Sequence, residues 1–213
     1  MTEPAQLVYR PIVALRGARS YVHSTDLYAE ILAGAQALFG APCQGPLTIA
    51  FRALCAGTPR ILYRKSDPSE GEPVAEFSIG VEQLRVAGAV LSEPPCVSAR
   101  KPYNETRICA AATIDGDAIA SQRDVGAEPI EVLTALGVAL LNTRLPPKGS
   151  KWLLGKLQLA RPLRRDDAGG IRLALRANAA GNVAQLQALS EGQALGNMMF
   201  MLHKVVAVDA HRA

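Results

Sequence analysis

The stretch TDLYAEILAGAQALFG (residues 25–40) has a clear helical periodicity. Its apolar residues recur three and four positions apart, which places them on one face of a helix. Ser24 or Thr25 offers an N-cap, and Asp26 falls in the first turn, where the helix dipole favours a carboxylate. Gly34 lowers helix propensity by about 1 kcal/mol relative to alanine, so we expect another group to pack closely against it. The pattern predicts one helix with a broad buried face.

A second stretch, EPIEVLTALGVALLNTRL (residues 128–145), repeats this spacing, with Pro129 where a first-turn proline belongs. The two predicted helices begin near residues 25 and 129, a shift of about 104 positions (129 − 25) in a chain of 213 residues. That shift is close to half of the chain. It suggests two halves that are built alike.

Alternating and turn-bounded segments follow each predicted helix and indicate strands. Residues 46–54, 60–65, 73–81 and 83–91 predict an antiparallel meander, with the turn-rich SDPSEGE (66–72) inside it. In the second half, residues 151–159, 171–177, 182–189 and 195–206 predict further strands. TRICAAATIDGDAIA (106–120) predicts a strand, an Asp-Gly turn and a strand.

The segment SEPPCVSARKPYNE (92–105) breaks the strand pattern with three prolines, which favours a boundary there. We therefore predict an α+β fold in one compact unit, with a first half at residues 1–95 and a second half at 96–213. Each half has one long helix wrapped by a curved antiparallel sheet. A lone helix on such a sheet leaves edges exposed, and a second copy would cover them.

This order of elements resembles the double hot-dog arrangement of acyl-thioester enzymes, over nearly the whole chain. The resemblance implies binding of an acyl thioester, carried by coenzyme A or by an acyl carrier protein. The dehydratase branch of that family has a His in an H-F-P-G-like stretch, which this sequence lacks. HSTDLYAE (23–30) supplies a His and acids at a different spacing. The resemblance therefore implies a thioesterase-like hydrolase before a dehydratase-like enzyme.

Three residues at the first helix are the candidate catalytic groups. His23 precedes the helix, whose free N–H groups would stabilise a thioester carbonyl, and a neutral imidazole could serve as a general base. Asp26 and Glu30 lie four residues apart on one face, and a helix-borne carboxylate holds the water in hot-dog thioesterases. The competing interpretations are a packing histidine, a first-turn partner of the helix dipole and a solvated acid.

Four further residues are candidates for substrate binding. Tyr103 and Asn104 lie in the polar segment between the halves, and such connections often line clefts. Arg161 and Arg164 could meet a phosphate of coenzyme A or an acidic carrier protein. A plain linker and a solvated loop are the alternatives.

Composition narrows the function classes. The net charge of +4 is dispersed and aromatic residues make up 5%, which argues against a nucleic-acid partner. The four cysteines have no C-x-x-C spacing, so we expect small buried residues in a reducing compartment and no metal or other cofactor. No basic and apolar leader begins the chain and no apolar run reaches about 18 residues. We therefore expect a cytoplasmic protein, and the abundance of Arg and Ala suggests a bacterial source.

Two functions from different classes remain. The leading hypothesis is a double hot-dog protein that binds an acyl thioester and hydrolyses it with a helix-borne carboxylate and water. The alternative is a non-catalytic member of this architecture that binds a small apolar ligand or forms a homo-oligomeric scaffold.

Overall fold

The computed structural model describes residues 7–63 and 71–204. The N-terminal residues 1–6, the last two residues of the strand predicted at 60–65, most of the turn predicted at 66–72 and the last two residues of the final predicted strand lie outside this description.

The helices begin close to the predicted starts. α1 spans Ser24–Phe39 and α3 spans Pro129–Arg144, and both have 16 residues. A short helix α2 (Glu105–Ala110) and a 3-10 turn η2 (Arg165–Gly169) complete the helical elements that the structure describes. α2 takes the place of the beginning of the first strand predicted at 106–120, while the rest of that strand, the Asp-Gly turn and the second strand are present. No helix in the described ranges is long and apolar enough to cross a membrane.

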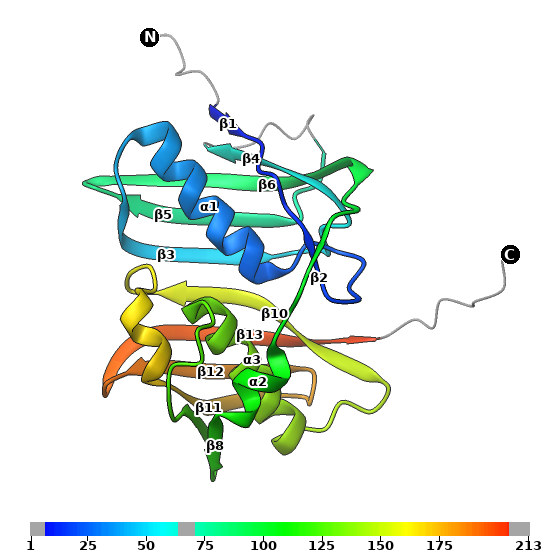
Figure 1. Ribbon diagram of the computed structural model, residues 1–213, viewed down its shortest axis with the longest axis vertical. Coiled ribbons are helices and arrows are strands. Elements are labelled where there is room, and N and C mark those ends of the chain that lie inside the picture. Colours follow the sequence, from blue (N-terminus) through cyan, green and yellow to red (C-terminus); the bar gives the residue numbers. More distant parts are fainter. Residues whose placement is uncertain (1–6, 64–70, 205–213) are drawn as a thin grey trace, which may run out of the picture.

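Eleven strands form one antiparallel sheet, in the order β1-β4-β6-β5-β3-β10-β13-β12-β11-β9-β8, and β2 pairs with β7 in parallel. Figure 1 shows α1 crossing the part of the sheet formed by β3–β6, while α2 and α3 lie against the part formed by β8–β13. We call these two parts the N-terminal half and the C-terminal half. The strands are β1 (Leu7–Tyr9), β2 (Leu15–Arg16), β3 (Cys43–Phe51), β4 (Gly57–Tyr63), β5 (Ala75–Val81), β6 (Leu84–Cys96), β7 (Arg100–Lys101), β8 (Ala112–Asp115), β9 (Ala118–Ser121), β10 (Ser150–Leu159), β11 (Ile171–Ala179), β12 (Val183–Ser190) and β13 (Gln193–Lys204).

The predicted meander of the N-terminal half is wrong in its strand order. β4 pairs with β6, and β5 lies between β6 and β3, so β4 and β5 are not neighbours. In the C-terminal half β11, β12 and β13 do follow one another as a meander. The halves therefore share the succession of elements but not the order of their strands. The proline-rich segment also differs from the prediction, because β6 continues through it to Cys96.

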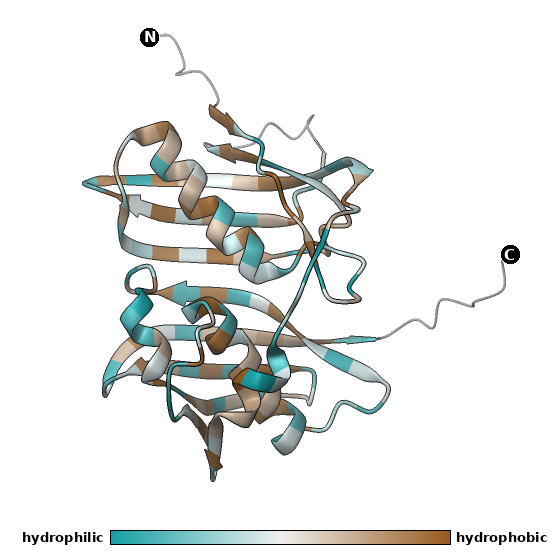
Figure 2. Ribbon diagram, viewed as in Figure 1, coloured by the Kyte–Doolittle hydropathy of each residue, from teal (hydrophilic) through white to brown (hydrophobic). Residues whose placement is uncertain are grey.

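The core lies between the sheet and the two long helices. Figure 2 shows hydrophobic and hydrophilic bands alternating along the strands, as expected where one face of a sheet is buried. Gly34 explains the close approach predicted for α1, because a Cβ there would meet the Tyr63 hydroxyl and the Tyr9 ring. The Tyr63 hydroxyl donates to the Ile31 carbonyl at 2.6 Å. Gly137 lets α3 approach Phe200 of β13 in the same way.

Backbone pairing and polar contacts join the halves. β3 and β10 pair directly, with Leu47 opposite Leu159 and Ala50 opposite Lys156. The Tyr28 hydroxyl of α1 accepts a hydrogen bond from the Leu163 N–H at 2.9 Å. The strand pairing makes the two halves one continuous sheet. The Tyr28 contact attaches α1 to the C-terminal half.

Candidate functional site

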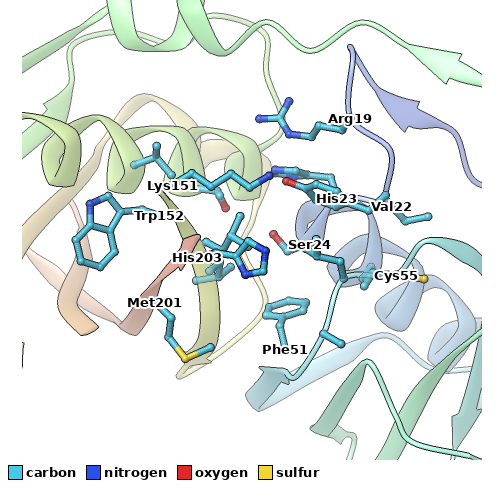
Figure 3. Close-up of a pocket in the computed structure, with 18 of the residues that line it drawn as sticks. Arg19, Val22, His23, Ser24, Phe51, Cys55, Lys151, Trp152, Met201 and His203 are labelled. Atoms are coloured by element: carbon cyan, nitrogen blue, oxygen red, sulfur yellow. The ribbon is translucent and has the colours of Figure 1, made fainter. Parts of the chain in front are cut away.

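A cavity of about 920 Å³ lies between the halves. Figure 3 shows residues of the C-terminal half on one side of it and residues around the start of α1 on the other. Its walls mix apolar side chains with a few polar groups, as is usual for small-molecule sites. The labelled lining residues are Arg19, Val22, His23, Ser24, Phe51, Cys55, Lys151, Trp152, Met201 and His203.

His23 is the N-cap of α1 and lines this cavity. The predicted caps, Ser24 and Thr25, instead lie inside the first turn. The His23 ring accepts a hydrogen bond on Nδ1 from the Thr25 backbone N–H, at 3.4 Å, and Nδ1 lies 2.8 Å from the Thr25 hydroxyl. An imidazole can replace Ser or Asp here because the cap needs only one acceptor at this position.

The electrostatics keep His23 uncharged. Burial, helped by the nearby charges of Arg19 and Arg16, lowers its pKa to about 3. The tautomer in which Nδ1 accepts from the Thr25 N–H and hydroxyl has its single proton on Nε2. None of the described residues forms a hydrogen bond with Nε2. In this tautomer His23 offers an N–H donor, and not a free basic nitrogen, to a ligand.

Tyr103 holds the His23 ring in place. The two ring centroids are 5.2 Å apart, and the guanidinium groups of Arg16 and Arg19 lie 5.5 and 4.6 Å from the Tyr103 centroid. Burial raises the pKa of Tyr103, so the phenol stays neutral. Tyr103 also lines the cavity, in agreement with its predicted place in a cleft. Its neighbour Asn104 is exposed and is not among the lining residues.

Asp26 is placed differently from the prediction of a water-activating base. Its carboxylate accepts two hydrogen bonds from Arg16, at 2.8 and 2.6 Å, and pairs with the Lys101 ammonium at 2.8 Å. It is buried and does not line the cavity. Both oxygens are thus engaged by cations, away from the cavity. Its place in the structure is that of an ion-pair residue.

Glu30 also lies away from the cavity. It accepts a hydrogen bond from the Tyr9 hydroxyl at 3.3 Å, and partial burial raises its pKa. The prediction placed Glu30 beside Asp26 on one helix face, and the electrostatic influence of Asp26 on Glu30 agrees with that. The structure does not bring this pair to His23 in a common cavity.

Arg161 and Arg164 line a second, polar cavity of about 580 Å³. Arg161 forms two hydrogen bonds of 2.8 Å with Asp167, and the Arg164 N–H donates to the same carboxylate at 2.6 Å. These bonds lower the pKa of Asp167, although burial acts in the opposite direction. The two arginines therefore organise the η2 turn, and no lining residue is shared with the cavity at His23.

Sequence reasoning missed several lining residues. Thr134 of α3 lines the cavity, is 4% exposed, and has a hydroxyl without a hydrogen-bond partner. Lys151 of β10 extends over the Tyr21 ring, 4.9 Å from its centroid. Cys55 is buried in the wall, and burial raises the pKa of its thiol. No local spacing connects these residues, because the two halves come together only on folding. Of the four cysteines expected to be buried, Cys55 is buried, Cys43 and Cys109 are half-buried, and Cys96 is exposed.

The depressed pKa of His23 predicts a pH-dependent stability. Unfolding returns the ring to a pKa near 6.5, so below that pH the unfolded chain binds a proton that the folded chain does not. The contribution of the neutral His23 ring to the free energy of unfolding is therefore present above pH 6.5 and is lost as the pH falls toward 3. We expect wild type to lose about 2 kcal/mol more than His23→Asn between pH 7 and pH 5, measured by urea unfolding. Equal slopes for wild type and His23→Asn would contradict the prediction.

The arrangement offers no metal centre within residues 7–63 and 71–204, because no three His, Cys, Asp or Glu side chains gather as ligands there. Glu105 is the one carboxylate among the described lining residues, and it pairs with Arg19 at 3.1 Å. The cavity therefore combines the His23 ring and the start of α1 with apolar walls and with the polar side chains of Arg19, Ser24 and Lys151.

Comparisons with known proteins agree on the architecture. No protein-family model matches the chain, and a search of curated proteins finds no match. A tesB protein from Mycobacterium avium subsp. paratuberculosis is similar in structure, with a TM-score of 0.50 and 10% identity over 94% of this chain and 93% of that one. A protein described as a thioesterase II from Thermobifida fusca has a TM-score of 0.49 and 10% identity, over 96% and 93%. The dehydratase domain of PpsC from Mycobacterium tuberculosis, solved with an acyl-CoA, has a TM-score of 0.47 and 12% identity, over 85% of each chain.

At such low identity the likeness concerns the fold. The tesB protein is matched over nearly the full length of both chains, with a TM-score of 0.50. The chain therefore has a hot-dog-like fold, and its resemblance to the double hot-dog proteins is confirmed.

Proposed function

We propose that the cavity between the halves binds an acyl thioester, with the thioester carbonyl at the start of α1 and the acyl chain along the apolar wall. The observation that carries this proposal is the neutral His23 ring, which caps α1 at the wall of a 920 Å³ cavity. A helix N-terminus and an N–H donor together favour the partial negative charge of a carbonyl oxygen. The structural neighbours include thioesterases and an acyl-CoA complex, which supports the choice of ligand class.

The reaction we propose for this site is hydrolysis. Water adds to the thioester carbon, the carbon–sulfur bond then breaks, and the departing thiolate takes up the proton that the water loses. The His23 Nε2–H donates to the oxygen that becomes negative in the tetrahedral intermediate. Arg16, the ion-pair partner of Asp26, helps to keep the ring neutral, while the Asp26 charge acts on the ring in the opposite direction.

Binding without turnover is the second candidate function. A specific observation favours it, because the predicted base is held by two cations and the lining carboxylate Glu105 pairs with Arg19. Such a protein would hold an acyl thioester, on coenzyme A or on an acyl carrier protein, without cleaving it.

Calorimetric titration with butyryl-CoA and hexanoyl-CoA, followed by an assay for released thiol, tests the proposal. Val138 of α3 is half-buried and lines the cavity, so Val138→Phe should fill part of it and weaken binding about tenfold or more. Ile12→Phe, at a fully exposed position, should bind as wild type does. No heat of binding for any ester, or equal affinity in both variants, would refute the site. Binding without thiol release would select the second candidate.

The two halves at 1–95 and 96–213 are also proposed to be copies of one ancestral unit. Each half has a long helix followed by four strands, which supports this proposal. The two middle strands of the sheet lie in opposite order in the two halves, and under this proposal that difference arose after the duplication. Superposing α1 and β3 on α3 and β10 is the check. The proposal fails if the helices do not coincide when the strands are aligned.

A further inference from the structure

The proposed hydrolysis needs a group that accepts the proton of the attacking water, and the cavity offers few candidates. Lysine, arginine and tyrosine side chains carry their protons at neutral pH. Burial raises the pKa of the Cys55 thiol, and the Glu105 carboxylate pairs with Arg19 at 3.1 Å. His23 uses Nδ1 for the cap of α1. Among the described lining residues, the imidazole of His203 is left.

His203 lies near the end of β13, and its backbone is held in place by neighbouring strands. β13 pairs with β10 through His203 itself and on to Lys204, the last residue of the strand. The Leu202 N–H also donates to the Asn182 carbonyl at 2.8 Å. Figure 3 shows the His203 ring turned into the cavity, toward the residues that begin α1. An imidazole of the C-terminal half thus faces the helix end of the N-terminal half.

The His203 ring is also open to water. Its side chain is exposed, and none of the described residues forms a hydrogen bond with either ring nitrogen. A neutral imidazole has one nitrogen that accepts a proton, and histidine ordinarily changes its charge near neutral pH. The ring therefore has a free acceptor for a water in the cavity, as a general base requires. His23, in contrast, is buried and has its acceptor nitrogen engaged.

Resting on the proposed function, we infer that His203 is the general base of thioester hydrolysis in this cavity. The water oxygen bonds to the thioester carbon while a ring nitrogen of His203 takes one proton from that water. The carbonyl oxygen becomes negative beside His23 and the start of α1. When the carbonyl forms again, the carbon–sulfur bond breaks and the imidazolium returns its proton to the departing thiolate. The products are a carboxylic acid and a thiol, and the ring is neutral again.

The test compares His203→Gln with wild type by thiol release from butyryl-CoA and hexanoyl-CoA, and by calorimetric binding of the same esters. A general base typically contributes about 10²–10⁴ in rate. We expect kcat to fall by about a hundredfold or more, while the Kd of each ester changes by less than about twofold, because the ring acts on the water. Lys204→Gln is the matched control on the next residue of β13, outside the lining residues, and should keep the wild-type kcat.

Chemical rescue distinguishes a base from a structural role. His203→Ala leaves space at an exposed part of the cavity wall, so added imidazole can take the place of the missing ring. We expect imidazole to raise the rate of His203→Ala by about tenfold or more, in proportion to its concentration. The same imidazole should leave the rate of wild type unchanged, and the rate without protein is subtracted.

The outcomes separate this inference from the proposed function. Wild-type kcat in His203→Gln, or a loss in His203→Ala that imidazole does not restore, overturns the role of His203 while hydrolysis at the cavity stands. Ester binding by wild type without any thiol release overturns this role together with hydrolysis, and leaves the cavity as a binding site. No binding of any ester overturns the site itself.

Discussion

Replacing Arg16 by methionine should lower the free energy of unfolding by about 3–5 kcal/mol, because it strips buried carboxylates of their shared cation. Arg16 forms two hydrogen bonds with Asp26 of α1 and an ion pair with Glu131 of α3, and its side chain is 9% exposed. One guanidinium therefore joins the two long helices, one from each half. The melting temperature should fall by roughly 6–20 °C.

An exposed arginine gives the matched control for this variant. Arg10 pairs with Glu93 at 2.5 Å but is 59% exposed, so Arg10→Met should cost less than about 1 kcal/mol. Adding Asp26→Asn and Glu131→Gln to Arg16→Met should restore part of the loss, because neither carboxylate then lacks the Arg16 cation. Urea unfolding at neutral pH measures all of these. If Arg16→Met lowers the free energy of unfolding no more than Arg10→Met does, the ion pairs of Arg16 with Asp26 and Glu131 do not hold the halves together.

The sequence predicted those parts of the fold that depend on local pattern. Helix periodicity located α1 and α3 because each buries a broad face within one continuous segment. Gly34 was correctly marked as a point of close packing. The pairing of β4 with β6 was not foreseen, because alternation shows that a segment is a strand and not which strand lies beside it.

The candidate site was predictable only where it coincides with a helix end. The stretch before α1 drew attention to His23, and the structure places that ring at the cavity wall. Asp26 was assigned by its helical spacing from Glu30, yet its environment is set by Arg16 and Lys101, which come from separate strands. Thr134 is an ordinary helix residue in sequence. Its missing hydrogen bond is visible only in the folded chain.

Changing His23 should have the largest effect on the proposed chemistry. Removing one preorganised donor to a developing oxyanion typically costs about 10²–10³ in rate. We expect His23→Ala to lower kcat/KM for acyl-CoA hydrolysis by that factor, and to weaken acyl-CoA binding if wild type binds without turnover. Because the wild-type ring has a pKa near 3, the wild-type pH profile should have no step near pH 6.5 that depends on this residue.

His23 also caps α1, so a loss of activity has to be separated from a loss of structure. His23→Ser and His23→Ala both remove the ring, but serine keeps an acceptor for the Thr25 N–H. Serine should therefore be the more stable of the two by about 1 kcal/mol, while both lose activity or affinity to the same extent. Activity in the serine variant equal to that of wild type would leave His23 as a cap alone. If the more stable of the two variants is also the more active, the loss of activity comes from the loss of the helix cap and not from the loss of the Nε2–H donor.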